Sequence, residues 1–270
     1  MQLVSGSFTR YRVHEPLGLG PDGPVHRARA ERLGARPVAL RRLTVPAGTA
    51  RARLRRDAET IAALGHPTLA VVHDIVEIDD EDVLVAATLG DRGSLADGRT
   101  LGPLAVDEAA PLVRSVADAL ASAHRLGLAH GRVRATNVVF TDDGPVLCDL
   151  AQSAALGREA SIAGDVADLV HLAASLVADA DRSPRAVAYR AICRWSAESA
   201  TDVAGLVAAL DRLDQVRPAP PRPPPAPAPA EPRGMPVDAT VGSAAAGLVV
   251  GGSLVVGTTV GALATLLAVL

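Results

Sequence analysis

The sequence predicts an α+β domain with a β-rich N-terminal part, followed by a proline-rich linker and one transmembrane helix. Three observations support this. Short, alternating, strand-like runs come before residue 90, and most helical patterns come after it. Of the 20 prolines, 10 fall between Arg217 and Pro236. No Asp, Glu, Lys or Arg follows Asp238. We therefore expect a folded domain over 8–214, a linker over 215–238 and a membrane helix over 241–270.

Composition narrows the possible functions. Hydrophobic residues make up 49% of the 270 residues, which is enough for a packed core. The net charge of −3 and the 2% aromatic content argue against a nucleic-acid binder. Two cysteines are too few for a disulfide-stapled domain or a four-cysteine zinc site. All basic residues other than histidine are arginines, because the chain contains no lysine.

Hydrophobic periodicity gives the elements of the folded domain in order. Alternation between turn residues indicates strands, and apolar residues three and four apart indicate helices. We expect strands over 11–17, 25–30 and 38–43, a helix over 50–64, a hairpin of 69–78 with 82–89, a helix over 107–127, short strands over 138–140 and 146–148, and helices over 165–179 and 201–213.

The two C-terminal segments predict a membrane anchor. Proline removes backbone donors and fixes φ, so the linker is expected to be an extended spacer, although PPRPPPAP could also bind a proline-recognition domain. The uncharged stretch 241–270 exceeds the ~20 residues that span a bilayer. Arginines lie only on its N-terminal side, which predicts a single-pass cell-membrane protein with a cytoplasmic domain. Small residues four apart could support a homodimer: Gly247, Gly251, Gly257 and Gly261.

A glycine-rich segment, Leu17 to Val25, provides the first candidate site. Its GxGxxG pattern, Gly18, Gly20 and Gly23, would let backbone N–H groups approach phosphates. A dinucleotide fingerprint leads directly into a helix. Here strand-like residues follow, so we reject that interpretation.

Further motifs follow in a fixed order. Val38-Ala39-Leu40-Arg41 looks like a VAIK strand. Asp57, or as second choice Glu59, lies at the position of the acidic residue in the helix that follows this strand. The segment 130–137, HGRVRATN, aligns with HRDLKPxN, and Cys148-Asp149-Leu150-Ala151 aligns with xDFG. Gly164-Asp165-Val166 resembles the start of the next conserved helix. Together these motifs cover about 200 residues and resemble the bacterial eukaryote-like (Hanks-type) Ser/Thr protein kinases.

The resemblance implies a two-lobed kinase-like fold, with a β-rich N-lobe and a helical C-lobe, and a set of site residues. The nucleotide-binding set would be Gly18, Gly20, Gly23, Val25, Ala39, Arg41 and Asp57. Asn137 and Asp149 would hold Mg²⁺, and ATP is the implied nucleotide. Asn137 could instead only hydrogen-bond its own loop. Ile61, Val72, His130 and Leu150 would form an internal spine, with His130 as a core histidine. Ala87 aligns with the gatekeeper and Trp195 is expected in the core.

Departures from the family pattern concern the chemistry. Arg132 occupies the position of the catalytic base, and an arginine has no acceptor for a proton. Arg41 replaces the phosphate-pairing lysine and is expected to form an ion pair with Asp57. Arg132 and Arg134 could hold a phosphate near the loop, or could be solvated charges.

The segment after Asp149 is short. Only 15 residues, 150 to 164, separate Asp149 from Asp165, and no APE motif is present. The activation segment and substrate platform of the family need more chain than this. Ser153 and Ser161 lie in this short segment and are not interpreted as regulatory sites.

These patterns predict a membrane-anchored, catalytically impaired pseudokinase that acts as an ATP-binding regulator or scaffold in signalling. Its partners would be proteins at the cytoplasmic face of the membrane. Two alternatives stay open: an active, atypical Ser/Thr kinase, and a partner-binding scaffold that holds no nucleotide.

Overall fold

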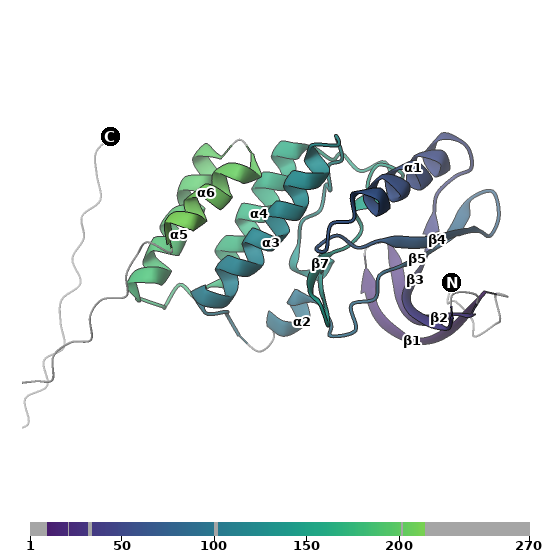
Figure 1. Cartoon of the computed structure of the whole chain (residues 1–270), viewed down its shortest axis with the longest axis horizontal. Helices are drawn as coiled ribbons and strands as arrows, with labels where there is room; N and C mark the ends of the chain where they lie inside the picture. The colour runs from purple at the N-terminus through teal and green to yellow at the C-terminus, as the bar shows by residue number, and fades with distance from the viewer. Residues whose placement is uncertain (1–9, 21, 32–33, 100–101, 201, 214–270) are drawn as a thin grey trace, which may run out of the picture. The chain divides into compact units, whose positions relative to one another are not determined.

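The computed structural model describes residues 10–20, 22–31, 34–99, 102–200 and 202–213. The predicted linker (215–238) and membrane helix (241–270) lie outside these residues. Within them, no helix is both long and apolar enough to cross a bilayer. The described residues form two lobes, a sheet with one helix and a bundle of helices (Figure 1).

The N-terminal lobe is a five-stranded antiparallel sheet in the order β1-β2-β3-β5-β4. Its strands are β1 (Tyr11–Gly20), β2 (Gly23–Ala30), β3 (Arg36–Thr44), β4 (Val72–Glu77) and β5 (Asp82–Ala87). Alternate residues of β2 and β3, such as Ala28, Val38 and Leu40, are buried, as the period of two requires. The expected antiparallel β4–β5 pairing is confirmed.

Helix α1 (Thr49–Leu64) lies beside the sheet. It buries Leu54, Ala58 and Ile61, which the spacing of three and four places on one face. It ends at Gly65 in the left-handed conformation (φ 61°), whose N–H caps the carbonyl of Ile61. The helix packs against β4 and against the short 3-10 helix η3 (Leu150–Gln152), so it touches both lobes.

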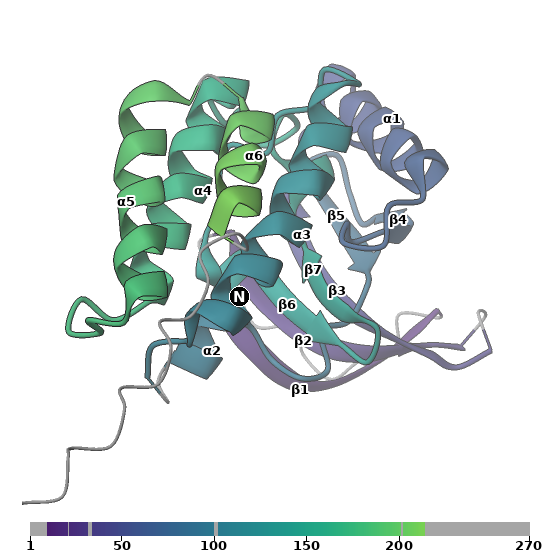
Figure 2. The same ribbon diagram turned by 60° about the vertical axis from the view of Figure 1, so that its left-hand side comes forward.

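The C-terminal lobe is mainly helical. It contains α2 (Leu95–Arg99), α3 (Val106–His124), α4 (Ile162–Leu176), α5 (Pro184–Ser199) and α6 (Val203–Leu213). The 3-10 turn η2 (Ala135–Asn137) leads into a hairpin of β6 (Val138–Thr141) and β7 (Gly144–Leu147). This hairpin lies between α3 and the sheet in both views (Figures 1 and 2).

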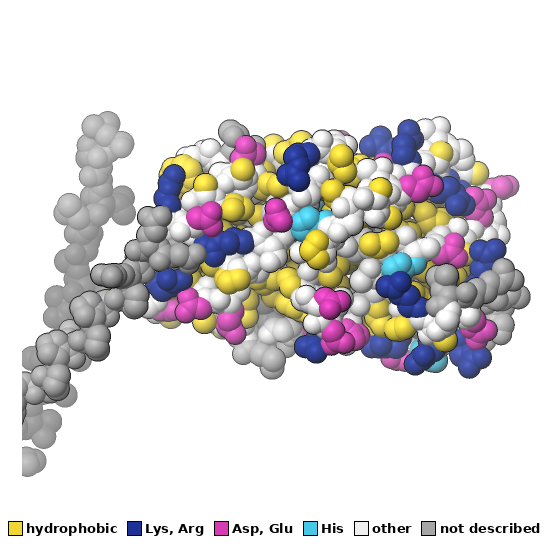
Figure 3. Space-filling view, viewed as in Figure 1, with side chains coloured by type: hydrophobic (Ala, Val, Ile, Leu, Met, Phe, Trp, Pro, Cys, Tyr) yellow, Lys and Arg dark blue, Asp and Glu magenta, His cyan; other side chains and the backbone are white. Residues whose placement is uncertain are grey.

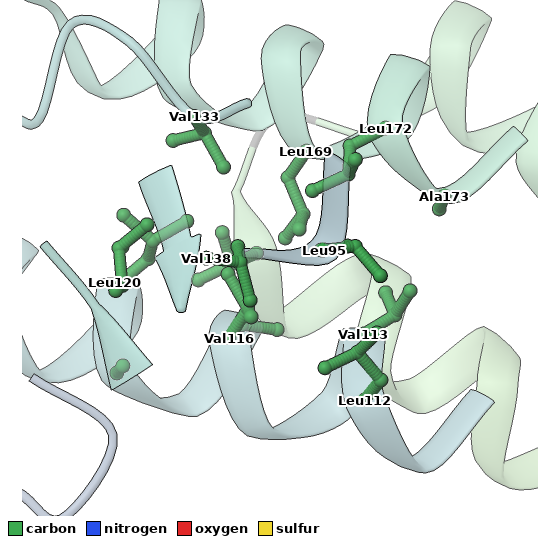
Figure 4. Packing of buried hydrophobic residues seen from close by; sticks show 14 of the residues in the cluster. Leu95, Leu112, Val113, Val116, Leu120, Val133, Val138, Leu169, Leu172 and Ala173 are labelled. Carbon is green, nitrogen blue, oxygen red and sulfur yellow. The ribbon is translucent and has the colours of Figure 1, made fainter. Parts of the chain in front are cut away.

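One large hydrophobic cluster connects the lobes. In the helical part, Val116 and Leu120 of α3 point toward Val138, and Leu169 and Leu172 of α4 approach from the other side (Figure 4). The cluster continues to Ile61 of α1 and to Leu43, Val83 and Val85 of the sheet. A second, smaller cluster lies within the sheet and includes Tyr11 and Leu84. The main core therefore fixes the sheet lobe against the helices.

Two expectations from the sequence were wrong. Trp195 is 47% exposed, not part of the core. It lies on α5, whose buried residues Ala186, Tyr189, Cys193 and Ser196 have helical spacing. Most of these side chains are small or polar, so hydrophobic periodicity did not reveal the helix. A start signal was nevertheless present, because Ser183 caps the helix and Pro184 follows it. Helix α4 also starts at Ile162, three residues before the predicted start.

Truncation of a core leucine tests this packing. Leu120→Ala should lower the free energy of unfolding by about 2–5 kcal/mol, because Leu120 is fully buried. Leu126→Ala is the matched control, since that side chain is 49% exposed, and should cost less than about 1 kcal/mol. Denaturant unfolding of both variants gives the comparison. Equal losses would contradict the described core.

Candidate functional site

The glycine-rich segment forms the end of the β1–β2 hairpin. The strands pair as far as Gly20 opposite Gly23. Gly23 has φ +112°, a conformation that favours glycine and tightens the turn. The turn brings Asp22 to the interface between the lobes, where only 18% of its side chain is exposed. Sequence reasoning treated the segment as a backbone cradle and missed Asp22.

Arg41 on β3 reaches across to the other lobe. Its Nη1 lies 2.8 Å from Oδ2 of Asp149 and 3.4 Å from Oε1 of Gln152. The side chains of Arg41 and Asp149 are only 12% and 10% exposed. Asp149 itself is left-handed, with φ 74°. The pair Arg41–Asp149 therefore forms a largely buried charged contact between the lobes.

The expected ion pair between Arg41 and Asp57 does not form. Asp57 is buried on α1, and its Oδ2 accepts from Nε of Arg53, one turn earlier, at 3.2 Å. A partner four residues away on the same helix satisfies the carboxylate locally. Arg41 is meanwhile held by Asp149, so both groups have other partners.

The loop from His130 to Asn137 is held by a buried carboxylate on α4. Asp165 is fully buried and accepts from the backbone N–H of His130 (2.7 Å) and of Gly131 (2.6 Å). Nε2 of His124 lies 2.8 Å from the same carboxylate. Asp168, one helical turn later, accepts from the N–H of Val133 at 3.0 Å. Two carboxylates of α4 thus hold the backbone of this loop.

Arg132 extends from this loop toward Asp22. Its Nη1 lies 3.5 Å from Oδ2 of Asp22, beyond a good hydrogen bond, and has no hydrogen-bond partner among the described residues. Asn137 is buried, and its amide nitrogen donates to the carbonyl of Arg132 at 2.9 Å. Asn137 therefore supports the loop that carries Arg132. Among the described residues, no hydrogen bond or ion pair joins Arg134 to Asp22 or Arg132, and its side chain is exposed.

The short segment after Asp149 contributes a third arginine. Arg158 donates to Oδ2 of Asp22 and, at 3.2 Å, to Oγ of Ser153. Burial and the neighbouring Arg132 and Arg41 lower the pKa of Arg158, and Asp22 and Asp149 partly offset this. Ser153 is fully buried and donates to the carbonyl of His130. Arg158 carried no sequence signal, because nothing in the motif pattern indicates where this segment folds.

The same segment packs closely on the loop. Gly131 has φ +71°, and a Cβ there would lie 2.8 Å from Cβ of Ala160. Only glycine fits this contact. Ser161 then caps α4 by accepting from the N–H of Gly164 at 3.0 Å. Ser153 and Ser161, the two serines of this segment, both form hydrogen bonds within the folded domain. The short segment is thus packed against the loop.

The fold is similar to that of known proteins. No protein-family model matches the chain. The kinase domain of PknI from Mycobacterium tuberculosis superposes with a TM-score of 0.61 at 26% identity, over 80% of this chain and 99% of that one. The fold is that of a protein kinase.

Sequence comparison also finds protein kinases among the similar proteins. Serine/threonine-protein kinase PknE of M. tuberculosis is 29% identical over 192 residues, and kinase pkn2 of Myxococcus xanthus is 35% identical over 136 residues. The match covers 69% of this chain but only 34% of PknE, so the chain spans about a third of that kinase.

In kinase terms, the site lies between the glycine loop, β3, the catalytic loop and the start of the activation segment. Kinases of this family use ATP and Mg²⁺. Here Asp149, which aligns with the metal-binding carboxylate of kinases, is paired with Arg41, and the amide nitrogen of Asn137 is bound to its own loop. Three arginines, Arg41, Arg132 and Arg158, converge on the neighbouring Asp22. The donor set in this arrangement does not fit Mg²⁺ well, because a cation would compete with Arg41 and face like charges.

His130 is a core histidine, as the sequence predicted, and its contacts show that its ring is neutral. It is fully buried; Nε2 lies 2.8 Å from the carbonyl of Cys148, and Nδ1 accepts from the N–H of Arg132. These contacts assign the proton to Nε2. Burial lowers its pKa, more than its hydrogen bond and the nearby carboxylates raise it. Ile61 and Leu150 of the predicted spine are buried in the same core, and Val72 packs against it.

Acidification should therefore destabilise the domain. The pKa of His130 is below its ordinary 6.5 in the folded state, so its stabilising contribution is present above pH 6.5 and is lost as the pH falls below that value. Denaturant unfolding between pH 7.5 and about 5 should show this loss. His130→Gln should reduce the slope, whereas His14→Gln, at an exposed position, should leave it unchanged. An unchanged slope in His130→Gln would contradict the assignment.

Proposed function

We propose that this chain is a catalytically impaired protein-kinase-like regulator that binds a nucleotide and signals through protein partners. The observation that carries the proposal is the placement of Arg132. It occupies the position of the catalytic base and faces Asp22 in a cluster of arginines.

Loss of the base removes a large part of catalysis. In kinases, a carboxylate at this position accepts the proton of the substrate hydroxyl. A guanidinium stays protonated and offers no acceptor, and general-base catalysis is worth about 10²–10⁴ in rate. The Asp22 carboxylate cannot substitute, because it is engaged by Arg158 and lies near Arg132 and Arg41.

The packed activation segment supports the same proposal. A peptide substrate must be positioned for in-line transfer, and positioning supplies much of the rate of phosphoryl transfer. Here Ala160 sits against Gly131, and Ser153 is buried against the catalytic loop. This segment stabilises the lobe and leaves little chain for a docking platform.

The membrane part of the proposal rests on sequence. We propose that 241–270 anchors the chain in the cell membrane with the folded domain cytoplasmic, and that 215–238 spaces the domain from the bilayer. Partners would be proteins at that membrane face. Acidic and basic side chains are interspersed on the face drawn in Figure 3, which suits protein contacts better than nucleic acid.

One alternative function is favoured by a specific observation. Asp22 fills the arginine cluster with an internal anion, which would suit a scaffold that holds no nucleotide. An active kinase is not favoured, because Arg132 replaces the base and Asp149 is paired with Arg41.

A transfer assay tests the catalytic part of the proposal. The purified full chain, incubated with labelled ATP, Mg²⁺ and a generic protein substrate, should transfer no phosphate to itself or to the substrate. Asp149→Asn is the control variant, since transfer by this chain would need the Asp149 carboxylate. A signal that disappears in Asp149→Asn would establish an active kinase and overturn the proposal. A trace signal equal in both proteins would come from a contaminant.

A thermal shift tests the nucleotide part. Ligand at 100 times its Kd stabilises the folded state by about 2.7 kcal/mol, which shifts the melting temperature by several degrees. ATP at millimolar concentration should raise the melting temperature of the full chain, with or without Mg²⁺. The absence of a shift under both conditions would favour the scaffold without nucleotide.

A further inference from the structure

Three guanidinium groups converge on a single carboxylate oxygen. Oδ2 of Asp22 is contacted by Nη2 of Arg158 and lies 3.5 Å from Nη1 of Arg132 and 4.0 Å from Nη1 of Arg41. The three arginines come from the activation segment, the catalytic loop and β3. We call Arg41, Arg132 and Arg158 the arginine cage.

One carboxylate does not satisfy this cage. Only Arg158 makes a hydrogen bond to Asp22, and Nη1 of Arg132 is buried with no hydrogen-bond partner among the described residues. Buried donors without partners are costly. A phosphoryl group has three terminal oxygens and a larger charge, so it would match three guanidinium groups better than Asp22 does.

We propose that the arginine cage binds the polyphosphate of a nucleoside triphosphate without a divalent metal, and that Asp22 is the internal anion it displaces. The inference rests on the proposed nucleotide binding and specifies its chemistry. This binding mode differs from that of active protein kinases, in which Mg²⁺ neutralises the charge of the phosphates.

Charge arithmetic favours the metal-free mode. The cage and its two carboxylates, Asp22 and Asp149, carry three positive and two negative charges. Departure of Asp22 leaves three positive charges against one. Arg41 also occupies the Asp149 carboxylate at 2.8 Å, so a metal would have to break that pair. Guanidinium groups can supply the neutralising charge directly.

The position of Asp22 allows it to leave. It lies in the turn of the β1–β2 hairpin, away from the buried part of the sheet. Leu19 beside the turn is 85% exposed, and a Cβ at Gly18 would meet no atom within 4 Å. Among the residues of β1, only Tyr11 is buried, and it lies at the opposite end of the strand. Movement of this hairpin end would therefore expose no buried residue of β1.

Calorimetric titration of the full chain tests the inference. ATP is titrated in EDTA and, separately, in excess Mg²⁺, and inorganic tripolyphosphate is titrated in EDTA. We expect ATP to bind in EDTA at least as tightly as with Mg²⁺, and tripolyphosphate to bind the same site and compete with it.

Charge-removing variants locate the site. Arg158→Gln should weaken binding in EDTA by about tenfold or more, because it removes a charge-assisted hydrogen-bond donor. Arg55→Gln is its control, since Arg55 pairs with Glu77 on the surface. Asp22→Asn should tighten binding by about tenfold, by removing the competing anion. Glu15→Gln, in the same hairpin but paired with Arg27, should change nothing. Arg158→Lys, which keeps the charge, should be intermediate, and thermal unfolding checks that each variant folds.

The outcomes separate the two proposals. Binding only in Mg²⁺ would overturn the metal-free inference and leave nucleotide binding intact. Binding in EDTA that Arg158→Gln and Asp22→Asn do not alter would place the nucleotide outside the cage and would also overturn the inference. No binding in either buffer, even by Asp22→Asn, would overturn the proposed nucleotide binding itself.

Discussion

The ion pair between Arg41 and Asp149 is the contact on which the site depends. It joins β3 of the sheet lobe to the start of the activation segment, and both side chains are largely buried. Burying a charge is costly, so loss of either side chain would leave the other charge buried without a partner. Once Arg41 is committed to Asp149, Asp57 must find a partner on its own helix, and the metal position loses its free carboxylate. This pair thus adds a charged contact between lobes that the shared hydrophobic core already holds together.

Around this pair, the chain keeps the kinase scaffold and changes the groups that would react. Asp165 still holds the catalytic loop by its backbone, and His130 still bridges that loop to the carbonyl of Cys148. Asp165 binds backbone N–H groups of the loop, and His130 is the loop side chain that the second contact requires, so neither contact depends on the side chain at position 132. The loop can therefore present Arg132 in place of a base without losing its conformation. A short activation segment completes the change, because its Arg158 and Ser153 turn back onto the site.

The sequence predicted the lobes and most strands and helices from periodicity, and the core position of His130 from the ordered motifs. It also placed Arg41, Arg132 and Asp149 in one region by resemblance. It could not predict the partners of Arg41, since both Asp57 and Asp149 were chemically suitable and only the three-dimensional arrangement decides between them. Asp22 and Arg158 were missed because one lies in a turn and the other in an irregular segment, and sequence patterns do not show where the side chains of such segments lie. Trp195 was misplaced because a large apolar side chain alone does not reveal which face of a helix it occupies.

A double-mutant cycle on Arg41 and Asp149 tests the central claim most directly. The free energy of unfolding is measured for the native chain, Arg41→Gln, Asp149→Asn and the double variant, which isolates the coupling between the two side chains. The structure predicts a favourable coupling above about 1 kcal/mol. For a largely buried charged pair, the double variant should lose less stability than the sum of the losses in the two single variants. A coupling near zero would show that the two groups do not interact in solution, and would contradict this account of the site.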